Sequence, residues 1–193
     1  MLNKQMTNYI ANNVNNNEIE LNNFEKVYAE KHQLVPQDVT IVDKGFHTSV
    51  IERCNKETEE VIRTETDNFL NESASYLKKN LNEFLFVESN TFEIIGVDGI
   101  ALEFDDVFET YTALFGLKLQ KKYGPAIKAF LDTHLQGDNT KYSVMFSGED
   151  GLWDMNFALS YIEGFNDELS FEQVLKMVYL FIFKLSEAVE DDK

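Results

Sequence analysis

Four carboxylates that are close together in the sequence are the first candidates for chemistry. They are Glu103, Asp105, Asp106 and Glu109. Hard divalent cations prefer carboxylate oxygens, and a carboxylate pair can also divide the roles of general acid and general base. The group could therefore serve a metal-assisted hydrolase. The plainer interpretation is that acidic residues gather at a helix start, where they stabilise the positive end of the helix dipole.

The histidines and the single cysteine do not form a recognisable ligand set. His32, His47 and His134 lie far apart, and none has a second His or a Cys within the three to five positions typical of zinc sites. Cys54 lies among apolar residues, which favours a buried small side chain over a nucleophile. The sequence also lacks the common phosphate-loop and hydrolase motifs. We therefore expect no catalytic residue, no metal, no cofactor and no enzyme activity.

A candidate partner-binding surface combines lysines with aromatic residues. Lys118, Lys121 and Lys122 are spaced to fall within about one turn of a helix. They could dock an acidic segment of a partner or of a second subunit, or they could simply form a solvated helix face. Trp153 and Phe157 belong to an alternating apolar pattern further along the chain. Apolar area left exposed near them would offer a docking site for a partner.

The composition describes an acidic globular protein. The chain has 193 residues, of which 44% are hydrophobic, enough to bury one sizeable core. Its formal charge of −17 disfavours direct binding to nucleic acid, which depends on neutralising phosphates. No apolar run approaches the ~20 residues that cross a bilayer. The first 17 residues lack the apolar stretch of a secretory signal, and with one cysteine we expect a cytoplasmic protein that contacts no membrane.

The charge is unevenly distributed along the chain. Residues 80–117 contain eight acidic residues and neither Lys nor Arg, and residues 149–193 contain 11 acidic residues against three lysines. Such segregation can guide the encounter with a basic partner and raise the association rate. It can also serve solubility alone.

The spacing of apolar residues predicts helices in the first part of the chain. A short helix is expected before an Asn-rich loop at 12–17, and a second helix over 18–33. Residues 46–81 contain neither Gly nor Pro, and their apolar residues recur at three- and four-residue steps. This pattern predicts a long amphipathic helix that is interrupted near 71–75, followed by a short helix over 74–82.

Alternating patterns in the second part of the chain predict an antiparallel sheet. The expected strands are 84–87, 92–95, 100–104, 142–146 and 152–161. Val97-Asp98-Gly99 is predicted to form a hairpin turn. The expected helices are 107–117, 125–135 and a closing helix from Ser170. The sequence therefore predicts an α+β fold with an antiparallel sheet of about five strands. Residues 1–72 would be an N-terminal helical region packing on an α-β-β-β-α-β-β-α domain at 73–193.

The closing helix carries the clearest local signals. Ser170 with Gln173 forms a capping-box pattern, and Leu169 and Val174 are placed for a hydrophobic staple. The middle of the helix, Met177–Phe183, is apolar around its whole circumference. It must therefore be buried on all sides, which one sheet face cannot achieve. We expect a second covering layer, either the N-terminal helices or a second copy of the chain.

The residues from 141 onward also carry a resemblance to a known fold. They are Lys141–Phe146, Glu149–Trp153, Phe157–Leu159 and the closing helix from Leu169 to Val189. Over roughly the last 120 residues, the order of elements resembles the type III secretion chaperone-like fold and its YbjN-like bacterial relatives, known loosely as sensory-transduction regulators. The resemblance implies an acidic non-enzyme that dimerises and holds another protein. The N-terminal 70 residues and the helical insert before Lys141 are additions to that pattern.

Three functions follow from these observations. The first is a non-enzymatic cytoplasmic protein-binding module, chaperone-like or regulatory, that forms a homodimer and covers an apolar or basic segment of a protein partner. The alternative is an acidic inhibitor that mimics the phosphates of nucleic acid and blocks a DNA-binding protein. The third, built on the four carboxylates, is the metal-assisted hydrolase.

Overall fold

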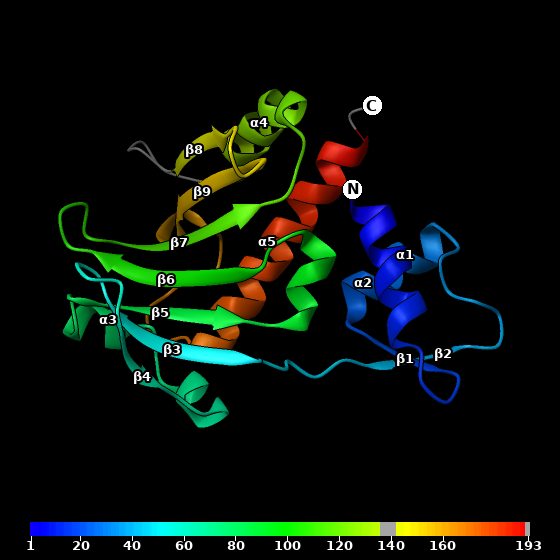
Figure 1. The fold of residues 1–193 in the computed structure, drawn as a ribbon, viewed down its shortest axis with the longest axis horizontal. Helices are drawn as coiled ribbons and strands as arrows, with labels where there is room; N and C mark the ends of the chain where they lie inside the picture. Colours follow the sequence, from blue (N-terminus) through cyan, green and yellow to red (C-terminus); the bar gives the residue numbers. More distant parts are fainter. Residues whose placement is uncertain (136–141, 192–193) are drawn as a thin grey trace.

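The centre of the fold is an antiparallel sheet (Figure 1). The computed structural model describes residues 1–135 and 142–191. Across the sheet, the seven strands are β4 (Val61–Thr64), β3 (Val50–Asn55), β5 (Glu83–Glu88), β6 (Gly99–Asp105), β7 (Thr110–Leu117), β9 (Leu152–Ala158) and β8 (Tyr142–Ser147). The predicted α+β class is confirmed, and the sheet has more strands than the five expected.

The closing helix α5 (Phe171–Asp191) packs on one face of the sheet and passes behind the strands in Figure 1. It begins at the predicted capping box. The Ser170 hydroxyl accepts the Gln173 N–H at 3.3 Å, and the Gln173 side chain accepts the Ser170 N–H at 2.9 Å. Alternate side chains of the strands, including Leu85, Leu102 and Met155, are buried beneath the helix as the core.

The N-terminal region packs against α5 beside the main sheet (Figure 1). It consists of α1 (Leu2–Asn13), β1 (Glu18–Leu21), α2 (Asn23–Lys31) and β2 (Thr40–Asp43), with β1 and β2 paired in parallel. The ring of Phe24 lies 5.7 Å from that of Tyr179 and 5.0 Å from that of Phe183, centroid to centroid. The N-terminal helices of the same chain therefore cover the apolar middle of α5.

The long helix predicted over 46–81 is wrong. This segment forms β3, β4, the 3-10 helix η1 (Asp67–Asn71) and α3 (Ser75–Lys79), of which only α3 matches a predicted helix, the short one over 74–82. Both faces of β3 bury an apolar residue, Ile51 on one face and Cys54 on the other, and this step of three residues imitates helical spacing. Because β3 and β4 join the main sheet, that sheet begins before the predicted division at residue 72.

Three other segments also differ from the predictions. Residues 18–21 form β1, so the expected helix over 18–33 reduces to α2. Residues 92–95 lie in the 3-10 helix η2 (Asn90–Ile95), so Val97–Gly99 does not join two hairpin strands. Residues 107–117 form a turn and β7 in place of a helix.

The remaining predicted elements of the second half are present. The helix expected over 125–135 is α4 (Gly124–His134), and β8 and β9 form the expected hairpin. The second arm of that hairpin is shorter than predicted, because the 3-10 helix η4 (Leu159–Tyr161) follows β9. In the described part of the chain, no helix combines the length and apolar character needed to cross a membrane.

Candidate functional site

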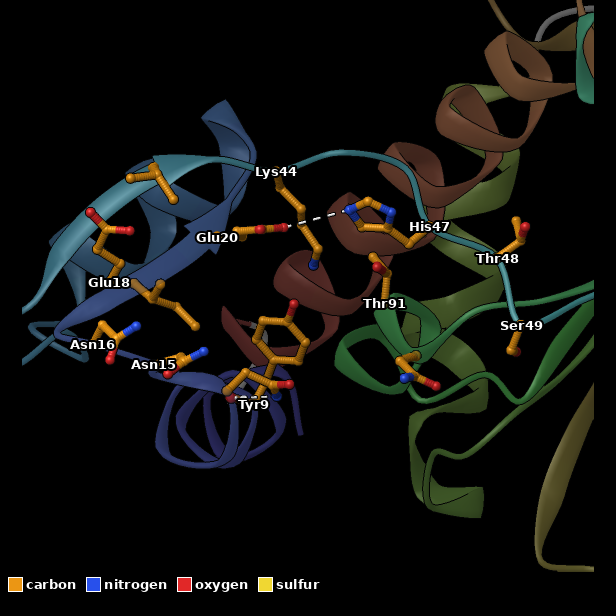
Figure 2. Close-up of a pocket in the computed structure, with 14 residues that line it drawn as sticks. Tyr9, Asn15, Asn16, Glu18, Glu20, Lys44, His47, Thr48, Ser49 and Thr91 are labelled. Carbon is orange, nitrogen blue, oxygen red and sulfur yellow. Dashed lines mark hydrogen bonds and ion pairs between the residues drawn. The ribbon is translucent and has the colours of Figure 1, made fainter. Parts of the chain in front are cut away.

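A pocket of about 420 Å³ lies where the N-terminal region meets the segments next to the main sheet (Figure 2). Its walls come from α1, β1, β2, the connection that leads from β2 to β3, and η2. They are lined mainly by polar residues: Tyr9, Asn13, Asn15, Asn16, Glu18, Ile19, Glu20, Val42, Lys44, His47, Thr48, Ser49, Asn90 and Thr91. The pocket exists only because the N-terminal region docks against the rest of the fold.

Lys44, which lines the inner side of this pocket, belongs to a buried ion pair. The side chains of Lys44 and Glu25 are only 4% and 0% exposed. Lys44 Nζ lies 3.3 Å from Glu25 Oε1 and 3.5 Å from Oε2. Lys44 directly follows β2, and Glu25 lies in the first turn of α2. Burying two charges is tolerated here because each compensates the other.

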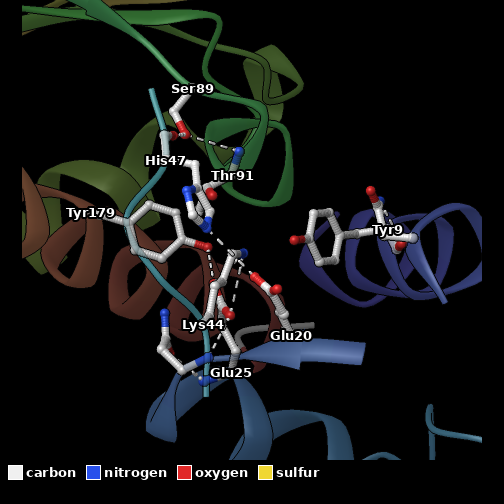
Figure 3. Close-up of polar contacts among 10 residues, drawn as sticks. Tyr9, Glu20, Glu25, Lys44, His47, Ser89, Thr91 and Tyr179 are labelled. Atoms are coloured by element: carbon white, nitrogen blue, oxygen red, sulfur yellow. Dashed lines mark hydrogen bonds and ion pairs between the residues drawn. The ribbon is translucent and has the colours of Figure 1, made fainter. Parts of the chain in front are cut away.

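Glu25 joins three parts of the fold (Figure 3). Its Oε2 accepts the Asn22 backbone N–H at 2.9 Å, and the Asn22 side chain accepts the Glu25 N–H in return, which completes a capping box at the start of α2. Its Oε1 accepts the hydroxyl of Tyr179 on α5 at 2.5 Å. The carboxylate therefore fastens α2 and the chain after β2 to the closing helix.

The electrostatics of the pocket follow from this burial. Desolvation lowers the pKa of Lys44, and the neighbouring Glu25 partly opposes that shift. Burial first, and then the charges of Glu25 and Glu20, raise the pKa of Tyr9 to about 12. Its hydroxyl is therefore neutral near pH 7 and can donate a hydrogen bond. The Lys44 ammonium lies 4.2 Å from the centroid of the Tyr9 ring.

The outer rim of the pocket is more exposed and carries opposite charge. Glu18 and Glu20 lie on β1, and Glu20 Oε2 is 3.7 Å from Nε2 of the exposed His47. Figure 2 shows the Glu20 carboxylate pointing toward the His47 ring. The lining therefore changes from a buried cation at its inner side to carboxylates at the rim.

The aromatic residues predicted for partner binding lie inside the fold. Trp153 and Phe157 are 6% and 1% exposed. The Trp153 ring packs against Phe146, and Phe157 packs against Phe181 of α5. Both face the covered side of the sheet, so they stabilise the core and cannot meet a partner in this fold.

The three lysines do not share a helix face. Lys118 follows β7 and pairs with Asp98, whereas Lys121 and Lys122 begin the 3-10 helix η3 (Lys121–Tyr123). Lys121 Nζ lies 5.7 Å from the centroid of the Phe146 ring, and Lys122 Nζ lies 4.9 Å from that of Tyr123. All three remain exposed, and their part in partner binding stays a prediction.

The four carboxylates are not assembled into a site. Glu103 on β6 pairs with Lys56 at 3.8 Å. Asp105 accepts the N–H groups of Val107 and Phe108 at 2.9 and 3.0 Å, which makes it a turn residue. Asp106 and Glu109 are exposed in the same β6–β7 turn, so the predicted helix start is also wrong. Within residues 1–135 and 142–191, no three His, Cys, Asp or Glu side chains are grouped so as to hold a metal ion.

The second face of the main sheet is a separate candidate site. On this face, away from α5, a row of neighbouring residues runs from Phe86 through Ala101 and Leu114 to Asn156. These side chains are half-buried, and the described helices that pack on the sheet lie on its other side. A Cβ atom on Gly99 would lie 2.6 Å from the Phe86 ring, so the absence of a side chain there lets the ring lie against the sheet.

Carboxylates border the apolar row on the same face. Glu52 lies opposite Phe86, and Glu103 lies opposite Phe84 in the strand register. Asp154 lies opposite the exposed Met145 on the edge strand β8. We call this surface, apolar in its middle and acidic around it, the open sheet face.

Comparison of the chain with protein-family models, curated proteins and solved structures gives no match.

Sequence reasoning did not find the pocket or the buried hydrogen-bond network behind it. Lys44, Glu25 and Tyr179 are ordinary residue types separated by long stretches of sequence, and they form no local motif. The one local signal is the Asn22–Glu25 capping-box spacing, which marks a helix start and not a binding site.

Proposed function

We propose that the protein is a non-enzymatic cytoplasmic binding module that covers an apolar, basic segment of a protein partner with its open sheet face. The observation that carries this proposal is the half-buried row of Phe86, Ala101 and Leu114, which no described helix covers. Apolar surface that stays partly hydrated gains free energy when a partner removes it from water, at about 25 cal/mol per Å².

The border of the open sheet face defines the chemistry of the partner. Glu52 lies at one end of the apolar row, and Glu88 and Asp154 lie beside the row on the same face of β5 and β9. A segment that presents Leu, Ile or Phe flanked by Lys or Arg would match both features, because the apolar contacts give affinity and the charges give orientation and faster association.

The edge strands extend the same surface. β8 is the last strand on one side of the sheet, and its Met145 is exposed on the open sheet face. β4 is the last strand on the other side, where Val61 and Ile62 are exposed. Edge strands have free backbone donors and acceptors, so an extended partner segment could add to the sheet there. The homodimer implied by the resemblance stays a prediction.

The test is a selection of peptides on the whole protein. A random peptide library displayed on phage would be selected at about 0.15 M and again at about 0.5 M NaCl, conditions that differ in electrostatic screening. We expect enriched peptides that combine apolar residues with Lys or Arg and that still bind at the higher salt. Peptides that contain only basic residues and lose binding at high salt would contradict the proposal and favour a nucleic-acid mimic.

Matched variants locate the binding surface. Replacing Phe84, Leu114 and Leu152 with Thr removes apolar area from the open sheet face and preserves strand propensity. The control makes the same replacement by Thr at Val27, Leu81 and Val107, three exposed apolar residues outside the open sheet face. We expect the first triple variant to bind the selected peptides about tenfold more weakly or worse, and the control to bind like the wild type. Equal binding by both variants would exclude this surface.

A further inference from the structure

The pocket described above has hydrogen-bonding capacity that the fold does not use. An ammonium group carries three N–H donors. Lys44 directs its hydrogen bonds to the two oxygens of Glu25, at 3.3 and 3.5 Å. No other acceptor within the described residues takes a hydrogen bond from Nζ, although this side chain is almost fully buried. At least one of its donors is therefore available to a molecule in the pocket.

Two hydroxyl groups in the pocket also have unused hydrogen-bonding capacity. The hydroxyl of Tyr9 and that of Thr91 both line the pocket, and neither forms a hydrogen bond with another described residue. In Figure 3 the Tyr9 hydroxyl points toward the Lys44 ammonium, and Thr91 lies beside His47. Lys44, Tyr9 and Thr91 come from three different segments, so their convergence depends on the tertiary fold.

The distribution of charge selects among ligands. An anion in the pocket would meet the carboxylates of Glu18 and Glu20 at the rim and the buried Glu25 behind Lys44. A cation that entered fully would meet the Lys44 ammonium. An uncharged molecule with several hydroxyl groups meets neither obstacle, because each hydroxyl can both donate and accept a hydrogen bond. Donors from Lys44 and Tyr9 and acceptors from Glu20 and Asn90 match such a molecule.

We propose that this pocket is a binding site for an uncharged polyhydroxyl ligand of monosaccharide to disaccharide size. The hydroxyls of the ligand contact Lys44, Tyr9 and Thr91 at the inner side and Glu20 at the rim. The pocket volume of about 420 Å³ lies within the range usual for small-molecule sites. The site is separate from the open sheet face and goes beyond the proposed partner binding.

Calorimetric titration of the whole protein tests the proposal. The neutral probes are myo-inositol, D-glucose and trehalose, and the charged probes are inorganic phosphate and spermidine. We expect at least one neutral probe to bind saturably with a Kd of about 1 mM or below, and the charged probes to bind more weakly. Absence of saturable binding by every neutral probe would overturn the proposal, as would tighter binding of phosphate or spermidine.

Two conservative variants place the ligand. Tyr9→Phe removes a hydroxyl but keeps the ring beside Lys44, and Thr91→Val removes a hydroxyl with little change of shape. Each should weaken binding of the neutral probe about tenfold, the effect of losing a well-placed hydrogen bond. Tyr142→Phe is the matched control, because it removes a hydroxyl that bonds Asp132 outside the pocket. Equal weakening in all three variants, or unchanged binding in the two pocket variants, would overturn the location.

Discussion

The buried Glu25–Lys44 pair makes the sharpest prediction about stability. Glu25→Gln keeps the size of the side chain and an oxygen that can accept the Tyr179 hydroxyl, but it removes the charge that compensates Lys44 and the second oxygen, which accepts the Asn22 N–H. Lys44→Met keeps an unbranched chain and leaves the Glu25 carboxylate uncompensated. Removing one partner of a buried pair costs about 3–5 kcal/mol, because the other charge stays unpaired in a poorly solvated place.

The double variant separates charge compensation from packing. If the two charges stabilise each other, losing both leaves no unpaired charge. The cost of Glu25→Gln with Lys44→Met should then fall below the sum of the two single variants by about 1–3 kcal/mol. The free energies come from equilibrium urea unfolding at pH 7, followed by circular dichroism and by the fluorescence of the single tryptophan, Trp153.

An exposed pair of the same type is the matched control. Lys31 Nζ lies 3.3 Å from Glu187 Oε1, the same separation as in the buried pair, but it is largely exposed. Lys31→Met and Glu187→Gln should each cost about 1 kcal/mol or less. If the variants of Glu25 and Lys44 cost no more than these, or if their costs add without coupling, the pair does not fasten the N-terminal region to α5 as argued.

Three further predictions concern pH, a close contact and a helix cap. Because the pKa of Tyr9 is raised from 10 to about 12 in the folded state, its stabilising contribution is complete below pH 10 and is lost as the pH rises through 12. Urea unfolding should show stability falling over that interval more steeply in the wild type than in Tyr9→Phe, and parallel curves would contradict this. Gly124→Ala would place a Cβ 2.6 Å from buried Trp153 and should lower stability by about 1–3 kcal/mol in the same assay. Gly148→Ala, with no atom within 4 Å of the added group, is its control, and equal costs would refute the clash. Ser170→Ala removes the hydroxyl that caps α5 and should cost about 1 kcal/mol in urea unfolding, whereas an unchanged midpoint would show that the cap does not stabilise the helix.

Local signals in the sequence predicted helices and strands correctly where those signals were unambiguous. The capping box at Ser170 marked the start of α5. The apolar circumference of the middle of α5 indicated that elements other than the sheet must also cover this helix. Strict alternation identified β6 and β9, since a period of two residues is typical of a strand with one buried face. These are features that a short window of residues can encode.

The errors arose where pairing between distant residues decided the structure. β3 buries Ile51 on one face and Cys54 on the other, so its apolar residues imitated helical spacing. In β4, the shift in pairing with β3 leaves Ile62 as an extra residue, which breaks the alternation there. The β-branched residues in this segment favour strands, and in the folded chain this preference outweighs the spacing. In β7, the Thr110–Thr112 segment has strand propensity, but acidic residues before it suggested a helix start.

The pocket could not be predicted because long-range packing creates it. Nothing near Lys44 in the sequence indicates a buried ammonium, and its carboxylate partner lies 19 residues earlier on another element. Burial of a lysine becomes visible only when α2, the end of β2 and α5 are placed together. The open sheet face was missed for a related reason, because Trp153 and Phe157 point to the face that α5 covers.

The covering of α5 by the N-terminal helices also affects how the chain folds during its synthesis. Tyr28 bonds Glu190 across 162 residues, and Tyr179 bonds Glu25 across 154. The ribosome therefore synthesises α1 and α2 long before α5, the helix against which they pack. Their apolar sides have no partner until α5 has been made. Contacts of such sequence separation slow folding, so this fold closes only after the last long helix has left the exit tunnel.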